Sequence, residues 1–370
     1  MKHASPYFEQ LHDRITALGG LHNAHLHLDR SGTLDATKEI LSEREKGREW
    51  QLSLATKHSL IPAIHESPCY DRPAMAERVN TFLDLMVAAG TTRAATVVDT
   101  TADRVGLGGL ELFVELKRER TGSLDLDVGA YSPLGFRDDE PWRWDLLVAG
   151  ARIADFIGLL PERDERRRYP EHIGFEECCR RGLRLAADLG KPVHVHVDQM
   201  NHPSENLSER LVKVFRELDL PVNRWETPWV WLVHVISPST YDERRFQRLL
   251  DSLVELNLGV ISCPSAAISM RQYRTAYTPT FNSIARVLEM LAAGLHVRIG
   301  SDNICDITSP AGTPDLLQEL YVLCNAVRYY DIELLAKLGA GLKPDAADRE
   351  RLHRHLHDDR AEISRLTKAA

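Results

Sequence analysis

The sequence contains no apolar run long enough to cross a membrane. A spanning helix needs about 20 predominantly apolar residues, and every apolar run of this chain is shorter. Its first residues, MKHASPYFEQ, lack the apolar core of a secretory signal peptide. Basic charge is also scarce, because 46 Lys and Arg residues face 54 Asp and Glu residues. Nucleic-acid-binding proteins usually carry a basic excess, so we expect a cytoplasmic protein that binds neither membranes nor nucleic acid.

Cysteine and glycine motifs are equally sparse. Six cysteines are scattered over 370 residues without a CxxC spacing, which favours reduced thiols over disulfides. No glycine-rich fingerprint follows the first apolar run, so nothing there indicates a dinucleotide site. Hydrophobic residues nevertheless make up 43% of the chain, enough for a large core. We therefore expect an ordinary globular fold.

Short apolar runs alternate with longer charged segments of helical spacing. Strands alternating with helices are typical of parallel βα units. About eight such units predict a closed (β/α)8 barrel of the TIM type over residues 1–340, with a doubly wound open sheet as the alternative. The eight predicted strands are residues 22–29, 93–100, 126–132, 154–160, 192–198, 229–236, 258–265 and 296–302.

Two polar segments lie outside this alternation. The connection 30–73 directly follows the first predicted strand and is too polar for a core. In a barrel it would lie over the carboxyl ends of the strands, as a lid or a wall. Residues 341–370 are predicted to form a charged helical tail, packed on the barrel or extending from it.

Polar side chains recur where the apolar strands end. In a strand, residues two apart share a face, and the carboxyl ends of all strands of a parallel barrel meet at one mouth. Each residue alone has a plainer explanation, as a core histidine or a helix cap. Together they are costly to bury without a metal, which favours a metal site. They are His25 and His27 in LHNAHLHLDR, His194, His196 and Asp198 in VHVHVD, His234 in LVHVIS, and Asp302 in SDNICD.

The order of the motifs HLHLDRS, HVDQ, VHVIS and SDNICD resembles that of the amidohydrolase superfamily, in its cytosine deaminase-like branch. SDNICD is more similar to the motif of N-isopropylammelide amidohydrolases than to that of cytosine deaminases. The resemblance implies one divalent ion per chain, Zn²⁺ first, with Fe²⁺ or Mn²⁺ as alternatives. It also implies that His234 is either the base that orients the metal-activated water or an electrostatic partner of it. The implied ligands are His25, His27, His196 and Asp302, and Asp302 would also take the proton of the water.

Dinuclear members of the superfamily have a carboxylated lysine at the fourth strand. This chain reads IGLLPERDE there, without lysine, so we expect a mononuclear site. Three imidazoles and a carboxylate leave a position for water, whose pKa a divalent ion lowers toward about 7. We therefore expect a hydrolase that cleaves an amide, imide, amidine or amine carbon–nitrogen bond in a small nitrogen heterocycle.

Three departures from the family pattern keep alternatives open. Gln199 stands where the deaminases have a proton-shuttling Glu, and an amide cannot carry a proton at neutral pH. Either the substrate needs no acid there, or Asp198, Glu205 or another carboxylate supplies it, or the protein is no longer a catalyst. Pro133 replaces a substrate-binding Gln, which argues against cytosine. We also expect a barrel without the accessory β-sandwich of most members of the branch.

Two further hypotheses therefore stand beside the hydrolase. The first is an aminohydrolase of a heterocycle other than cytosine, with a substitute proton shuttle. The second is a catalytically silent barrel that binds a metal or ligand. A barrel whose histidines are merely structural would bind no metal at all.

A small-molecule substrate is expected at the mouth, and a homo-oligomer is an open alternative. Trp229 and Trp231 should be packing residues. An arginine of PERDERRRY could bind a carboxylate or phosphate, although a solvated helix start is the plainer reading. The loop SMRQYRTAYTPT could close over an anionic or aromatic ligand. The residues expected at the mouth are Asp99, Tyr131, Arg163, Asp198, Trp225, Asn303 and Asp306, with Arg271, Tyr273, Arg274 and Tyr277 in the loop.

Overall fold

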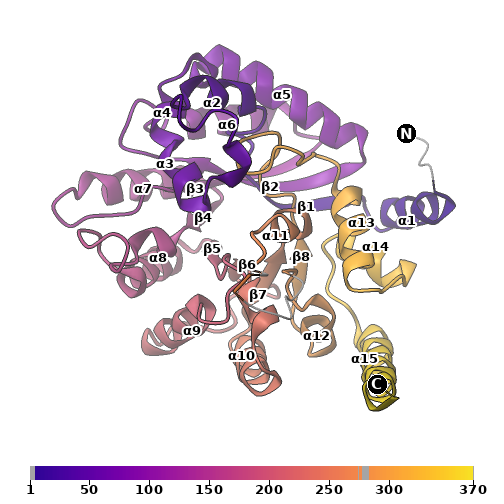
Figure 1. Ribbon diagram of the computed structural model, residues 1–370. Helices are drawn as coiled ribbons and strands as arrows, with labels where there is room; N and C mark the ends of the chain where they lie inside the picture. The colour runs from indigo at the N-terminus through magenta and orange to yellow at the C-terminus, as the bar shows by residue number, and fades with distance from the viewer. Residues whose placement is uncertain (1–4, 274, 277–282, 370) are drawn as a thin grey trace.

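Eight parallel strands form a closed barrel surrounded by helices (Figure 1). The computed structural model describes residues 5–273, 275–276 and 283–369. Each strand pairs with the next along the chain. The ring closes where Leu26 bridges Asp302. The strands are β1 Leu21–Leu26, β2 Thr91–Asp99, β3 Asp125–Tyr131, β4 Phe156–Leu159, β5 Val193–Val197, β6 Val230–His234, β7 Gly259–Ser262 and β8 Val297–Ile299.

The predicted (β/α)8 barrel is thus confirmed, and an open doubly wound sheet is excluded by the β1–β8 closure. All eight predicted runs contain a strand. Every residue of β1 and β4 to β7 is buried, as expected for strands covered on both faces. Trp229 and Trp231 are buried packing residues, as predicted. The six cysteines, all within the described residues, are free.

A helix follows every strand, and the apolar face of each packs on the barrel. Asp242 caps α10 and Asp315 caps α13, each accepting a backbone N–H of its helix. In chain order the helices after the strands are α5 Arg72–Ala88, α6 Gly108–Glu119, α7 Trp142–Ile153, α8 Phe175–Leu189, α9 Leu207–Glu217, α10 Glu243–Glu255, α11 Pro264–Ile268 with α12 Val287–Ala292, and α13 Leu316–Ala326 with α14 Ile332–Gly339. Helix α1, Pro6–Ala17, precedes β1 and packs on α14.

The connection 30–73 is built of short helices rather than open loop. In order these are α2 Leu34–Ile40, η1 Glu49–Gln51, α3 Leu54–Ser59, α4 Ile61–His65 and η2 Pro68–Tyr70. In Figure 1 this indigo segment lies beside the carboxyl ends of the first strands.

The final helix is α15, Ala346–Ala369, which packs on α12. Leu352 is buried, whereas residues 357–368 are exposed. A helix is thus present where one was predicted, and the division of the chain into a barrel and a tail stays a prediction. Among the described residues, no helix combines the length and apolar character needed to cross a membrane.

A buried ionic network anchors the connection 30–73 to the end of β2. The Arg30 guanidinium donates to both carboxylate oxygens of Asp99, and His65 Nε2 lies 3.0 Å from the same carboxylate. His65 Nδ1 lies 2.8 Å from Asp103 Oδ2. Asp99 is therefore held beneath the mouth by Arg30 and His65, and the expectation that it lines the mouth is corrected. Both oxygens are occupied by side chains of the connection.

This network makes stability depend on pH. Burial opposes a charge on His65, but hydrogen bonds to Asp103 and Asp99 outweigh it and raise the pKa of the imidazole from 6.5 to about 9. A group whose pKa rises on folding stabilises fully below its unfolded pKa, and the contribution is lost as the pH rises through the folded pKa. We expect the free energy of unfolding to fall by up to about 3 kcal/mol between about pH 6.5 and pH 9.

Urea unfolding of the wild type and of His65→Gln across that range tests this expectation. The variant should be less stable at about pH 6 and should lose less stability as the pH rises. Equal pH slopes for the two proteins would show that His65 is not the titrating group.

Candidate functional site

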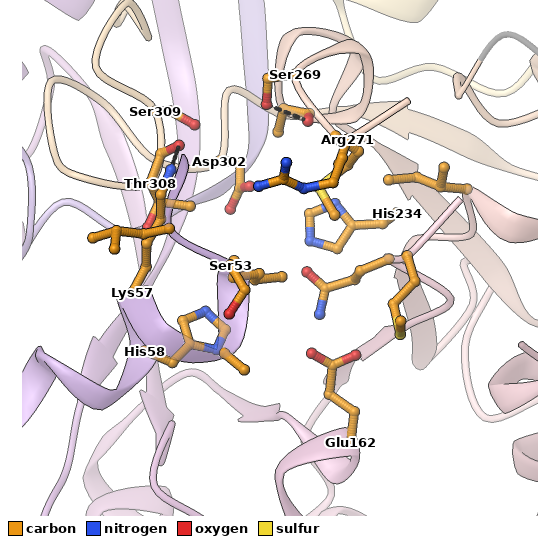
Figure 2. Close-up of a pocket in the computed structure, with 18 of the residues that line it drawn as sticks. Ser53, Lys57, His58, Glu162, His234, Ser269, Arg271, Asp302, Thr308 and Ser309 are labelled. Atoms are coloured by element: carbon orange, nitrogen blue, oxygen red, sulfur yellow. Dashed lines mark hydrogen bonds between the residues drawn. The ribbon is translucent and has the colours of Figure 1, made fainter. Parts of the chain in front are cut away.

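A cavity of about 620 Å³ opens at the carboxyl ends of the strands (Figure 2). Its volume is in the range of small-molecule sites. Every part of its lining follows a strand in the chain, which is where barrel active sites form. The lining residues include Trp50, Leu52 to Ala55, Lys57 and His58 after β1, Glu162, Arg163, Arg168 and Tyr169 after β4, Gln199 and Met200 after β5, His234 and Ile236 from β6, Ala266 and Ser269 to Arg271 after β7, and Asp302 with Thr308 to Pro310 after β8.

Three histidines converge under this cavity. One ring nitrogen each of His25, His27 and His196 lies within 4.8 Å of the others, and all three side chains are buried. The Nε2 atoms of His25 and His196 are 3.0 Å apart. His196 Nδ1 donates to the Leu159 carbonyl at 2.9 Å, which turns the Nε2 lone pair toward the other two rings.

Asp302 completes the cluster from the other side of the barrel closure. Its Oδ1 lies 3.3 Å from His27 Nε2 and 3.8 Å from His25 Nε2. Burial raises the pKa of Asp302, but the hydrogen bond to His27 and the neighbouring imidazoles outweigh it and hold the pKa below its usual range. The carboxylate is therefore ionised at neutral pH.

These residues fit a divalent ion. Burial, and then the charge of neighbouring imidazoles, lowers the pKa of His25 and His196 well below 6.5, so both are neutral. Neutral imidazoles and a carboxylate are the donor set that zinc prefers. Two nitrogens bound tetrahedrally at about 2.0–2.1 Å lie about 3.3 Å apart, close to the separation of the His25 and His196 nitrogens. The residues that would hold the ion are His25, His27, His196 and Asp302.

The backbone is strained at the strand ends that carry the polar side chains of the site. His234, Val235 and Asp302 have positive φ of 80°, 50° and 60°, a region that non-glycine residues, and β-branched ones above all, rarely adopt. Each such residue costs on the order of 1–3 kcal/mol. The turn after β6 persists because the N–H groups of Val235 and Ile236 donate to Val197 O and Asp198 O. His234 thereby lines the cavity next to Asp302.

His234 itself is a neutral donor or acceptor at the cavity wall. Burial lowers its pKa, and the negative charge of Asp302 only partly opposes this. Its ring centroid lies 5.5 Å from that of His196 and 6.3 Å from that of His25. His234 and Asp302 thus line the same cavity.

Asp198 and Glu205, which the sequence analysis considers as sources of the acid, have structural roles instead. Asp198 is fully buried, and its two oxygens accept the N–H groups of Leu207 and Ser208 at the start of α9. It is a helix cap outside the cavity lining, which corrects its expected place against the substrate. Glu205 accepts Met200 N and the Ser237 hydroxyl, and it too is outside the lining.

Three further candidates support the site from behind rather than lining the cavity. The Tyr131 ring packs on His27 and His196 at 5.4 and 5.3 Å between centroids. Asp306 accepts Thr308 N, Ser309 N and Asn303 Nδ2. Asn303 and Asp306 therefore shape the loop that carries the lining residues Thr308 to Pro310.

Trp225 is at the opposite end of the barrel. It precedes β6, whose amino end is marked by the hydrogen bond from Val193 N to Trp229 O. Its side chain is 40% exposed and outside the cavity lining. The expectation that Trp225 lies at the mouth is therefore corrected, because a loop before a strand lies at the opposite end of a parallel barrel.

Gln199, Arg163, Arg271 and Tyr273 do line the cavity. Arg271 is on the rim, and its Nη2 donates to Gln51 O at 2.9 Å, joining the loop after β7 to η1. Arg274 and Tyr277 lie outside the described residues.

Glu162 is a lining residue that the sequence analysis missed. It follows β4 and is half-buried near Gln199. Burial raises the pKa of Glu162 from 4.5 to about 7, and Arg168 and the Gln199 amide only partly offset this. Figure 2 shows its carboxylate directed into the cavity. The sequence signal for it is an acidic residue just past a strand end.

The comparisons with known proteins agree with this fold. No family model matches the sequence. An uncharacterized protein of Haemophilus influenzae is 26% identical over 292 residues, 78% of this chain and 96% of the relative. A pterin deaminase of Rhizobium rhizogenes is 22% identical over 71% of this chain, which spans only 58% of that relative's length.

Solved structures give the same result. A 5-methylcytosine deaminase from Klebsiella pneumoniae superposes with a TM-score of 0.72 and 22% identity, over 86% of this chain and 73% of that one. An N-isopropylammelide isopropylaminohydrolase from Burkholderia multivorans superposes with a TM-score of 0.64 and 18% identity, over 91% and 82%. At these identities the likeness shows the fold.

Because three histidines converge, the metal content of the purified protein directly tests the predicted metal site. Protein purified without chelators should hold about one divalent ion per chain, and a His25→Ala, His27→Ala double variant should lose it, because two of three imidazole ligands are gone. Elemental analysis measures both. His194→Gln is the control, since His194 is a buried histidine of β5, the strand that carries His196, but lies outside the cluster. Equal metal content in the double variant and the wild type would refute the site.

Proposed function

We propose that this protein belongs to the amidohydrolase superfamily and is a metal-dependent hydrolase that cleaves a carbon–nitrogen bond in a small nitrogen heterocycle. The observation that carries the proposal is the convergence of His25, His27, His196 and Asp302 under a cavity at the carboxyl end of the barrel. The names of the structural neighbours, a 5-methylcytosine deaminase and an isopropylaminohydrolase, support it.

The three histidines and Asp302 would hold the ion, with zinc as the first choice and Fe²⁺ or Mn²⁺ as alternatives. When bound, the ion would activate a water as nucleophile and polarise the attacked carbon centre. Asp302, ionised and on the cavity wall, accepts the proton of that nucleophile. His234, neutral and beside it, donates a hydrogen bond to the oxygen that forms on the attacked carbon.

Glu162 supplies the group that Gln199 lacks. A carboxyl group with a pKa of about 7 exchanges protons readily at neutral pH, whereas an amide only hydrogen-bonds. Glu162 therefore delivers a proton to a ring nitrogen or to the leaving amine, while Gln199 orients the ring. This carboxylate favours the more specific function, an aminohydrolase of a heterocycle other than cytosine.

Replacement of Asp302 separates a hydrolase from a silent binding barrel. We expect Asp302→Asn to lower the release of ammonia from amino-substituted heterocycles at least about 10³-fold, because the variant lacks the base and a metal ligand. Asp315→Asn is the matched control, since Asp315 lies in the same connection and only caps α13. A silent protein would release no ammonia in either form and would bind its ligand without regard to Asp302.

Replacement of Glu162 tests the proton carrier. We expect Glu162→Gln to lower kcat by about 10²–10⁴-fold. The wild-type rate should fall as the pH rises through about 7, because only the protonated carboxyl donates, and this limb should be absent from the residual activity of the variant. The matched control is Glu165→Gln, whose native side chain pairs with Arg210. An unchanged pH profile in Glu162→Gln would assign the proton transfer elsewhere.

A further inference from the structure

Four basic side chains line the cavity without an acidic partner. Within the described residues, Lys57, Arg163, Arg168 and Arg271 form no ion pair with a carboxylate, although they line a common space. Elsewhere on the molecule arginines and carboxylates pair regularly, as Arg104 does with Asp71 and Arg245 with Glu209. An unpaired positive charge is therefore concentrated at the mouth.

The four fall into two groups with different surroundings. Arg163 stacks on the Tyr169 ring at 4.5 Å and donates to its hydroxyl. Arg168 acts on Glu162, whose pKa its charge lowers. These two arginines are thus already engaged around the proton carrier. Lys57 and Arg271 have no comparable partner.

Lys57 and Arg271 face the same part of the cavity from different loops. Burial lowers the pKa of Lys57, the charge of Asp306 partly opposes this, and the charge of Arg271 lowers the pKa again, so Arg271 is close enough to act on Lys57. They are held in place by backbone carbonyls, Arg271 by Gln51 O at 2.9 Å and Lys57 by Thr308 O at 3.5 Å. Figure 2 shows Lys57 at the left of the cavity and Arg271 at the upper right, with Glu162 at the bottom.

The acidic residue that acts on Lys57 does not neutralise the pair. Asp306 raises the pKa of Lys57 by more than Arg271 lowers it, but Asp306 lies outside ion-pair distance of Lys57, and its oxygens accept Asn303, Thr308 and Ser309. Two like charges therefore remain in a partly desolvated cavity, and neither forms an ion pair within the described residues. A bound anion would remove this repulsion and form charge-assisted hydrogen bonds with both groups.

We propose that the substrate of this site carries an acidic group, a carboxylate or a phosphate, which Lys57 and Arg271 bind. The inference rests on the proposed function, because it specifies which heterocycles the enzyme accepts. With the acidic group at Lys57 and Arg271, the ring extends toward Asp302, His234 and Glu162. A volume of about 620 Å³ accommodates a ring together with such a substituent.

Paired ligands test the inference by calorimetric binding and by ammonia release. The pairs are an aminopyrimidine carboxylate with its carboxamide, a pterin carboxylate with its carboxamide, and guanosine monophosphate with guanosine. We expect at least one acidic member to bind the metal-loaded wild type about 10- to 100-fold more tightly than its neutral partner. The carboxylate and phosphate pairs distinguish the two sources of negative charge.

Variants then locate the anion site. Lys57→Gln and Arg271→Gln should each remove about tenfold or more of the preference for the acidic member. Arg48→Gln is the matched control, because Arg48 is exposed in the same connection and does not line the cavity. Thermal unfolding checks that each variant folds.

The outcomes separate this inference from the proposed function. If no acidic member binds more tightly than its neutral partner, or if the preference survives in both variants, the inference is wrong. Turnover of neutral heterocycles without an acidic preference would leave the hydrolase standing and remove only the anion site. An acidic preference lost in both variants, without turnover of any ligand, would support the anion site and count against the hydrolase.

Discussion

The closure of the barrel between β1 and the end of β8 is the constraint on which the site depends. Asp302 N donates to His25 O at 3.0 Å, and His27 N donates to Asp302 O at 3.3 Å. The backbone bonds that join the first strand to the last therefore also bring the carboxylate to two of the histidines. His196 arrives from β5, across the barrel, and its ring is fixed by Leu159 O. The predicted metal ligands therefore come together only when the barrel closes.

The same closure explains why strained residues collect at the mouth. Asp302 and His234 turn into left-handed conformations as their strands end, and the turn after β6 continues through Val235. Neighbouring strand ends supply the hydrogen bonds that hold these conformations. The strain directs the polar groups into the cavity, and the packed, apolar strands below it offset the cost.

Sequence periodicity predicted the strands well because parallel barrel strands are short, apolar and bounded by polar segments. The histidine pair of β1 could also be predicted, since alternation along a strand determines which side chains share a face. Asp198 could not be distinguished from a substrate-binding residue, because a strand-end aspartate and a helix cap have the same sequence context. Trp225 was predicted at the mouth, but it precedes β6 and therefore lies at the amino ends of the strands. The role of Glu162 could not be predicted from the sequence, because its raised pKa depends on burial and its hydrogen bond to Gln199 depends on the fold.

The residues around the cavity divide into two kinds of scaffold. The predicted metal ligands are on strand ends or directly after them, whereas Lys57 and Arg271 come from connections that the backbone ladder does not constrain. Substitutions, insertions or deletions in those connections can alter what the cavity admits while the ligand geometry stays intact. The architecture therefore lets substrate preference evolve independently of bond cleavage. Related enzymes can keep one reaction centre and act on different substrates.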